Sequence, residues 1–296
     1  MKIKRSLGDH VFDVCNTAFM CFLMLIMLYP MLNVLAISLS SSAKVTQGVV
    51  TFYPQELNLE GYQYILKQSQ FYVGFRNSVI YAFFSTVFTL LFTSLAAYSL
   101  AIKEFVLKKF FTIFLTITMF FGGGMVPTYL LLKDLHMLNT LWVMVLPGCV
   151  SAYTVFVFRT FFQGLPGDLR ESAYIDGAND LYIWFKITLP LSKPLLATYA
   201  LFTIVGCWNS WFNALLYLQD ESRYPIQMFL RKMVVDGSIN SMYQGTEIGA
   251  LLSSGKVNPR NMQMAVIVLT MLPILCIYPF VQKYFVKGVM IGAIKG

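Results

Sequence analysis

Six long apolar stretches dominate this chain and limit what it can fold into. They cover residues 12–39, 77–102, 110–132, 140–162, 194–219 and 262–283. A helix of about 20 apolar residues crosses the roughly 30 Å hydrocarbon core of a bilayer, and each stretch is at least that long. Only 12% of the residues are charged, which is about half the usual fraction in a soluble domain. We therefore predict an all-α, polytopic membrane protein with six transmembrane helices in a single domain, residues 1–296.

The basic residues predict how these spans are oriented. An even number of spans places both termini on the same side of the membrane, and Lys and Arg concentrate in cytoplasmic loops. With both termini in the cytoplasm, 13 Lys and Arg lie inside and 9 lie outside, although the outer connections are longer. We therefore predict cytoplasmic termini. The net charge of +8 then reflects topology, and nucleic acid is not an expected partner.

The spans contain almost no ionisable side chains, which bears on the class of membrane protein. Ion-coupled carriers and pumps use intramembrane Asp, Glu, His or Arg to bind or relay the coupling ion. A self-contained secondary carrier or channel is therefore the weaker alternative. A membrane-embedded enzyme would need clustered acids or histidines, and the only acidic cluster lies in residues 163–193. Helix capping and docking explain that cluster better.

The fifth span carries amides between aromatic residues. Asn209 and Asn213 are four residues apart, so one face of a helix would present both amides together. Trp208 and Trp211 flank that face. Amides bond sugar hydroxyls and indole rings pack on sugar C–H faces, so these four residues are candidates for lining a substrate pathway. Amide bonding between helices, with interfacial Trp anchors, is the alternative.

A run of three glycines, residues 122–124, interrupts the third span just before Pro127. The run lacks the Lys and the Ser or Thr of a phosphate-binding loop. We therefore expect a break or kink in a helix that lines a pathway. Near Lys256 a second stretch resembles a nucleotide loop, but Ala250 and Val257 replace the Gly and the Ser or Thr it requires. The chain is not expected to hydrolyse ATP, and we predict no catalytic or metal-ligating residue.

A cytoplasmic connection, residues 163–193, has the pattern of two short helices. Asp168 is the expected N-cap of the first helix, and Glu171 is its expected capping-box partner. Gly177 suits the C′ position after the end of this helix. The first helix is therefore expected between Asp168 and Gly177.

The second short helix follows directly. Asn179 or Asp180 can cap its start, and we expect it to run to Ile187 and to be stopped by Pro190. Two short helices at a glycine turn, projecting between membrane spans, suit docking into a groove of a partner.

The same connection resembles a family motif. Glu171-Ser172-Ala173, then three residues to Gly177, then nine to Ile187-Thr188-Leu189-Pro190, is similar to the EAA loop of ATP-binding cassette importer permeases. The family pattern is E-A-A-x3-G-x9-I-x-L-P, and Ser172 in place of Ala is the sole departure. We name residues 163–193 the coupling loop.

The resemblance extends over most of the chain. The stretch from Gly123 to Tyr129, the pair Trp208-Asn209 and the ending from Gly288 to Gly296 resemble sugar-importer permeases of the maltose-permease type. Within that group the chain is most similar to permeases for complex oligosaccharides. The resemblance implies a substrate that is an oligosaccharide, with acidic oligo-uronides such as alginate or pectin fragments as candidates.

The resemblance also implies a location, partners and roles. The chain would be a multi-pass, non-enzymatic permease subunit in a bacterial inner or plasma membrane, and it would bind no cofactor itself. Its partners would be a second permease subunit in a heterodimer, two cytoplasmic ATPase subunits that bind ATP and Mg²⁺, and an extracytoplasmic sugar-binding protein. Residues 220–261 would receive that binding protein, and residues 287–296 would lie along the ATPases. The implied ATPase-coupling residues are Glu171, Ser172, Ala173, Asp176, Gly177, Ile187, Leu189 and Pro190.

Overall fold

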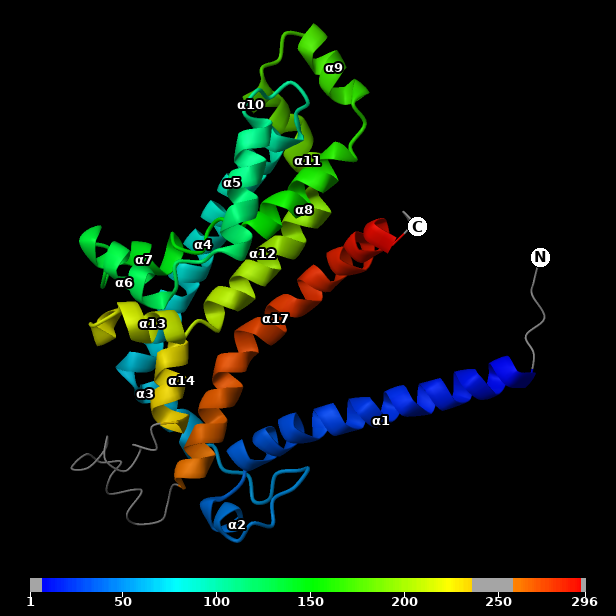
Figure 1. Cartoon of the computed structure of the whole chain (residues 1–296). Helices are drawn as coiled ribbons and strands as arrows, with labels where there is room; N and C mark the ends of the chain where they lie inside the picture. The colour runs from blue at the N-terminus through cyan, green and yellow to red at the C-terminus, as the bar shows by residue number, and fades with distance from the viewer. Residues whose placement is uncertain (1–6, 236–257, 294–296) are drawn as a thin grey trace. The chain divides into compact units, whose positions relative to one another are not determined.

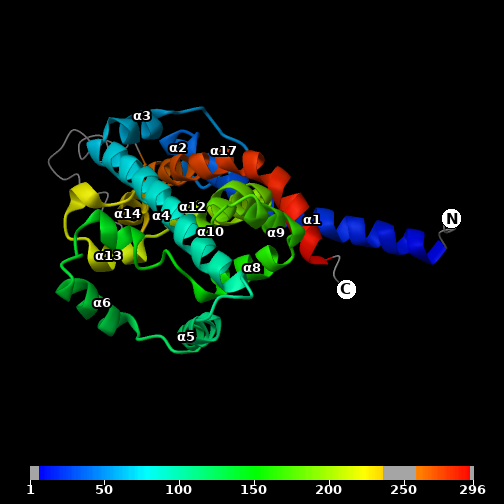
Figure 2. The same cartoon turned by 90° about the horizontal axis from the view of Figure 1, so that it is seen from above.

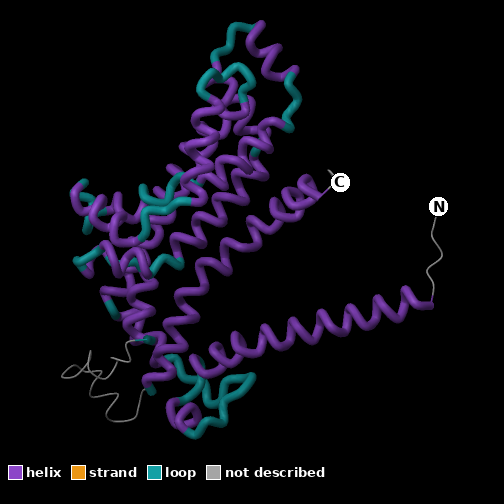
Figure 3. The backbone as a smooth tube through the Cα atoms, in the orientation of Figure 1, coloured by secondary structure: helices purple, strands orange, loops and turns teal. Residues whose placement is uncertain are grey.

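The computed structural model describes residues 7–235 and 258–293, which are drawn in colour in Figure 1. The described residues form helices and connecting loops without any strand (Figure 3). The all-α class predicted from the sequence is confirmed. The helices are α1 (Leu7–Ser38), α2 (Ser42–Thr46), α3 (Glu60–Lys67), α4 (Ser69–Ala101), α5 (Lys108–Phe120), α6 (Met125–Asp134), α7 (Leu141–Val145), α8 (Ala152–Gln163), α9 (Asp168–Ile175), α10 (Asp180–Ile183), a π-helical turn (Trp184–Thr188), α11 (Leu189–Leu191), α12 (Lys193–Trp208), α13 (Phe212–Tyr217), a 3-10 turn (Glu221–Arg223), α14 (Ile226–Val234) and α17 (Pro259–Ala293).

The chain divides into two compact units. The first comprises residues 1–69 and 230–272, and the second comprises residues 70–229 and 273–296. In the first unit, the Asn261 amide donates to the carbonyls of Ile37 and Ser40, both at 2.8 Å. These bonds join the start of α17 to the end of α1. That all of residues 1–296 form a single domain stays a prediction.

Three described helices are long and apolar enough to cross a membrane. They are Gly8–Ser38 in α1, Ser69–Ala101 in α4 and Pro259–Pro279 in α17, each with a mean hydropathy of at least 1.9. Their most apolar windows are at most 28% buried within the chain, as expected for helices whose outer surface meets lipid or another subunit. They correspond to the first, second and sixth predicted spans.

The other predicted spans are interrupted. α5 and α6, in the third predicted span, are bent by 119°. Asp180–Leu191 and α12 are bent by 82° just before the fifth predicted span, which itself divides into α12 and α13. Counting each bent pair as one span raises the number in the described residues from three to five. The predicted span at 140–162 divides into α7 and α8, with irregular backbone at residues 146–151. The count of six spans stays a prediction.

The predicted glycine break in the third span is confirmed. α5 ends at Phe120, and α6 begins after Gly124, whose φ of 84° and ψ of 173° lie in a region that is essentially restricted to glycine. In Figure 2, α5 is seen nearly end-on while α6 is seen from the side. The glycines therefore redirect the chain between two separate helices.

The expectation that Pro190 stops the second helix of the coupling loop is wrong. The helical run continues from α10 through the π-helical turn into α11, with Pro190 inside it. In the turn, the Leu189 N–H donates to the carbonyl of Trp184, five residues back. A proline ring clashes with the carbonyl four residues back in a regular α-helix, and the wider π-helical turn relieves that crowding. The run ends at Ser192 instead, where the 82° bend follows.

Replacing Gly124 with alanine should destabilise the break between α5 and α6. Because the backbone of Gly124 occupies a region that alanine rarely adopts, the free energy of unfolding should fall by about 1–3 kcal/mol. Thermal unfolding of the detergent-solubilised protein measures this. Gly122→Ala is the matched control, because nothing lies within 4 Å of a Cβ placed there. Equal losses in both variants would contradict the role given to Gly124.

Candidate functional site

The first helix of the coupling loop begins one residue earlier than expected. Gly167 is the N-cap of α9, and no side chain bonds to the cap. The backbone N–H groups of Arg170 and Glu171 donate to the Gly167 carbonyl instead. The predicted capping box of Asp168 and Glu171 is therefore wrong. Asp168 is the first helical residue, where a carboxylate still interacts favourably with the positive end of the helix.

The predicted glycine end of α9 is confirmed. Gly177 has a φ of 81°, and its N–H donates to the Tyr174 carbonyl at 3.0 Å. The next N–H, that of Ala178, donates to the Ala173 carbonyl at 2.9 Å. This pair of bonds is a Schellman motif, which uses glycine because the left-handed conformation costs it no side-chain clash.

Asn179 caps the second helix. Its side-chain oxygen accepts from the backbone N–H of Tyr182 at 2.8 Å, so the first of the two predicted cap candidates is the one used. Asp180, the first residue of α10, is thereby left to make contacts outside its own helix. α9 and α10 lie at the same end of the second unit (Figure 1).

One side of the coupling loop packs against the spans. Ala173, Ile183 and Trp184 are buried in a cluster with residues of α4 and α8, and Ile187 and Leu189 pack against that cluster. The α4 and α8 residues are Ala97, Tyr98, Leu100, Val155, Phe158 and Phe162. Burial of this apolar surface holds the loop onto the two helices.

The other side of the coupling loop is exposed. The remaining predicted coupling residues, namely Glu171, Ser172, Asp176, Gly177 and Pro190, are all exposed. Ile175, at the end of α9, exposes 86% of its surface. An isoleucine so exposed beside polar residues is typical of a surface that contacts another protein.

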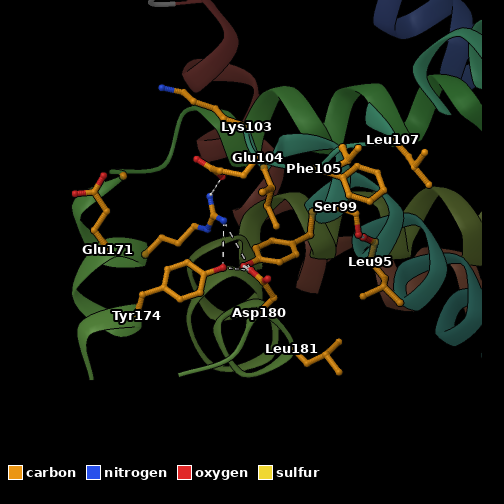
Figure 4. A pocket seen from close by; sticks show the side chains of 15 residues that line it. Leu95, Ser99, Lys103, Glu104, Phe105, Leu107, Glu171, Tyr174, Asp180 and Leu181 are labelled. Carbon is orange, nitrogen blue, oxygen red and sulfur yellow. Dashed lines mark hydrogen bonds and ion pairs between the residues drawn. The ribbon is translucent and has the colours of Figure 1, made fainter. Parts of the chain in front are cut away.

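Arg170 joins α9 to the α4–α5 connection through Glu104 and to α10 through Asp180. Figure 4 labels both acidic residues and marks their interactions with dashed lines. The Arg170 guanidinium donates to Glu104 at 3.1 Å and to the Tyr174 hydroxyl at 3.1 Å. The Tyr174 hydroxyl donates in turn to Asp180, which also accepts from the Tyr98 hydroxyl of α4 at 3.2 Å. We name these five residues the Arg170 network. It joins the coupling loop to the end of α4.

The network shifts the pKa of its members. Burial and the hydrogen bond to Asp180 raise the pKa of the Tyr174 hydroxyl, so it stays protonated as a donor. A bond from its own backbone N–H, followed by the bond from Arg170, lowers the pKa of Glu104. Burial by itself would lower the pKa of Arg170, but its bonds to Tyr174 and Glu104 raise it. The ionic contact is therefore maintained across the neutral pH range.

The Arg170 network was not predicted from the sequence. Arg170 and Tyr174 are four residues apart and share a helix face, and the guanidinium carbon lies 5.1 Å from the Tyr174 ring centre. Glu104 and Tyr98, however, are distant in sequence, and no local spacing links them to Arg170. The network borders a cavity of about 900 Å³ between the α4–α5 connection and α9.

A second cavity, of about 370 Å³, lies among α4, α6, α12 and α13. Hydroxyl and amide side chains contribute to its wall, including Thr89, Thr128, Thr203, Ser210 and Asn213. None of the residues that line it is charged. A wall of neutral donors and acceptors can bond the hydroxyls of a polar, uncharged surface.

The expected helical face with two amides is wrong. α12 ends at Trp208, Asn209 is its C-cap, and α13 begins at Phe212. The Asn209 oxygen accepts from Gln227 at 3.2 Å, whereas Asn213 lines the 370 Å³ cavity. Asn and Ser have low intrinsic helix propensity, and both occur at this break.

The two tryptophans of this stretch have different surroundings. Trp208 is buried, and its ring meets that of Phe75 edge-on at 5.6 Å. Trp211 is exposed and meets Phe212 edge-on. The break between α12 and α13 therefore separates the four candidates rather than gathering them on one surface.

Comparison with known proteins identifies the family. Residues 95–291 match the family described as binding-protein-dependent transport system inner membrane component. The chain belongs to this family. It is a permease subunit of an ATP-binding cassette importer and is not itself a catalyst, as the EAA motif of the coupling loop implied. The family description also confirms a multi-pass protein of the inner membrane.

This permease is similar to two relatives over nearly its whole length. It is 36% identical to "Protein LplC" of Bacillus subtilis (strain 168), covering 98% of this chain and 96% of that protein. It is 37% identical to the "Polygalacturonan/rhamnogalacturonan transport system permease protein YtcP" of the same organism, covering 97% and 99%.

A solved structure has the same fold. One chain of a bacterial ABC transporter involved in the import of the acidic polysaccharide alginate matches with a TM-score of 0.90 and 31% identity. The match covers 96% of this permease and 100% of that chain.

Removing the Tyr174 hydroxyl should loosen the coupling loop. Because Arg170 and Asp180 each lose a partner in Tyr174→Phe, the loop should be less stable by about 1 kcal/mol. Amide hydrogen exchange at the α9–α10 junction should then become several-fold faster, as mass spectrometry can measure. Tyr182→Phe, at a tyrosine of α10 that is 54% exposed, is the control. Equal protection in both variants would show that the network does not hold the loop.

Proposed function

We propose that this permease forms half of an importer for oligosaccharides of uronic acids, and that its coupling loop docks onto a cytoplasmic ATPase subunit. The docking role rests on one observation. The packed side of α9 is fixed to α4 and α8, while its opposite side is exposed with Ile175 at its end. A force applied to the exposed side would therefore reach the spans directly.

The ATPase-coupling residues have two distinct roles in this proposal. The exposed residues Glu171, Ser172 and Asp176 contact the ATPase. Ala173, Ile187 and Leu189 hold the loop against the spans, and Gly177 sets the turn between the two helices. Pro190 is exposed within the helical run that leads to α12. ATP and Mg²⁺ bind the partner ATPases, so the contribution of this chain is mechanical.

The wider assembly follows the family pattern. We propose a second permease subunit as heterodimer partner, two ATPase subunits, cytoplasmic termini and an extracytoplasmic binding protein. Residues 220–261 would receive that protein, and residues 236–257 of this stretch lie outside the described part of the chain. Residues 287–296 would lie along the ATPases, with residues 294–296 outside the described part.

The substrate class is proposed from the relatives and the solved structure. A relative named for polygalacturonan and rhamnogalacturonan transport and a structure of an alginate importer both concern acidic polysaccharides. The 370 Å³ cavity supports passage of the sugar, because its uncharged hydroxyls and the Asn213 amide can bond ring hydroxyls. The pathway roles of Trp208, Asn209 and Trp211 stay predictions.

Replacing Ile175 with aspartate should weaken docking to the ATPase. Burying an exposed isoleucine in a partner contributes about 1.5–3 kcal/mol to the free energy of binding. A carboxylate buried in its place weakens binding further, because it must be removed from water. Co-purified ATPase should therefore fall at least tenfold relative to this permease, measured after affinity capture of the complex.

Val106→Asp is the matched control for the docking variant. Val106 exposes 92% of its surface in the α4–α5 connection and lies outside the coupling loop. Retention of the ATPase in Val106→Asp and its loss in Ile175→Asp would support docking through α9. Full retention in both variants would refute it.

The substrate proposal is tested by uptake into proteoliposomes that contain the complete transporter, with its binding protein added. Oligogalacturonate or oligoalginate should enter in an ATP-dependent manner, whereas a maltooligosaccharide should not. Asn213→Ala should slow uptake about tenfold, because a hydrogen bond within the cavity is lost. Asn209→Ala, at the amide bonded to Gln227, should change uptake less. Preference for the neutral sugar would overturn the proposed substrate class.

A further inference from the structure

Among the three described helices long and apolar enough to cross a membrane alone, α4 is the one without an internal proline. α1 contains Pro30, and α17 contains Pro273 and Pro279. Its 33 residues run without a break, and at 1.5 Å per residue they extend about 50 Å. An uninterrupted helix of this length can transmit a displacement from one end to the other.

The first half of α4 holds a short segment, residues 222–226, through its backbone. The Asn77 amide donates to the carbonyls of Ser222 and Tyr224 at 2.8 and 3.1 Å. The Tyr81 hydroxyl donates to the carbonyl of Arg223 at 2.6 Å. Both Asn77 and Tyr81 are buried, so these bonds are shielded from competing water.

Two neighbouring residues complete the attachment. The fully buried hydroxyl of Ser78 accepts from the backbone N–H of Ile226 at 2.9 Å. One turn earlier, a Cβ added at Gly74 would lie 3.1 Å from the Cα of Ile226. A larger residue at Gly74 would therefore push the segment away from the helix. Residues 222–226 lead directly from the 3-10 turn into α14.

The last turn of α4 holds the coupling loop. Tyr98 is buried, and its hydroxyl donates to Asp180, the first residue of α10. Through Asp180 it joins Tyr174 and Arg170 of α9 (Figure 4). Asn77 and Tyr98 are 21 residues apart, or about 32 Å along the helix axis. One helix is thus attached at both ends by side chains that point out of it.

We infer that α4 transmits displacements of the attached segment, residues 222–226, to the coupling loop. Asn77 and Ser78 at one end and Tyr98 at the other are positioning residues for coupling ATP hydrolysis to substrate delivery. The inference rests on the proposed function, because it assumes the membrane orientation proposed for residues 220–261 and for the coupling loop. The family match begins at residue 95, so the attachment at Asn77 and Ser78 lies outside the matched region.

The test uses the complete transporter in lipid nanodiscs, with the sugar-binding protein added either loaded or empty. The quantity measured is the ratio of ATP hydrolysis with the loaded protein to hydrolysis with the empty protein. Asn77→Ala and Tyr98→Phe should each lower this ratio at least threefold. Because both attachments act in series, the double variant should be no worse than the more affected single variant. A merely structural defect would lower the yield of assembled complex and leave the ratio unaltered.

Tyr72→Phe is the matched control, since Tyr72 lies on the same helix and is 55% exposed. It should retain the wild-type ratio. If Asn77→Ala does not assemble, Ser78→Ala removes a single acceptor from the same attachment and takes its place. A wild-type ratio in the variants, or losses that multiply in the double variant, would show that α4 does not transmit displacements to the coupling loop. A wild-type transporter that the loaded binding protein does not stimulate would instead overturn the proposed function.

Discussion

Backbone polar groups within a bilayer have no water to bond, so every interruption of a span must provide its own partners or border a cavity. Two of the interruptions in this chain follow that constraint. The break at Asn209 forms local bonds, such as that from the Trp211 N–H to the Asn209 carbonyl at 3.0 Å. Ser210 from this break, and Pro147 and Gly148 from the break between α7 and α8, line the same uncharged cavity. Irregular backbone and polar space therefore occur together.

The sequence predicts best where one residue type determines the local conformation. Uninterrupted apolar stretches predicted α1, α4 and α17, and glycine predicted both the break at Gly124 and the end of α9 at Gly177. Prediction failed where two local conformations compete. A proline was expected to stop a helix, but the π-helical turn accommodates Pro190. The two amides of the fifth span were expected on a continuous helix, but α12 ends at Trp208, with Asn209 as its C-cap.

Only part of the candidate site could be predicted from the sequence. The EAA pattern located the coupling loop and its packed residues, since that motif is contiguous. The Arg170 network could not be predicted, because Glu104 is 66 residues away from Arg170 and no periodicity relates the two. The ion pair between Arg170 and Glu104 is exposed on the Glu104 side, so by itself it contributes little to the stability of the fold. Its importance is geometric, because one guanidinium fixes the orientation of α9 relative to α4.

The attachment of residues 222–226 to α4 has an evolutionary consequence. The four hydrogen bonds described above all involve backbone atoms on the loop side, at the residues from Ser222 to Ile226. Backbone groups are the same whichever side chain follows, proline apart. In the proposed assembly, the connection that begins at residue 220 could therefore diversify to recognise a different delivery protein while it keeps this attachment to α4. On that proposal, specificity on one face of the membrane and energy transfer on the other could change independently.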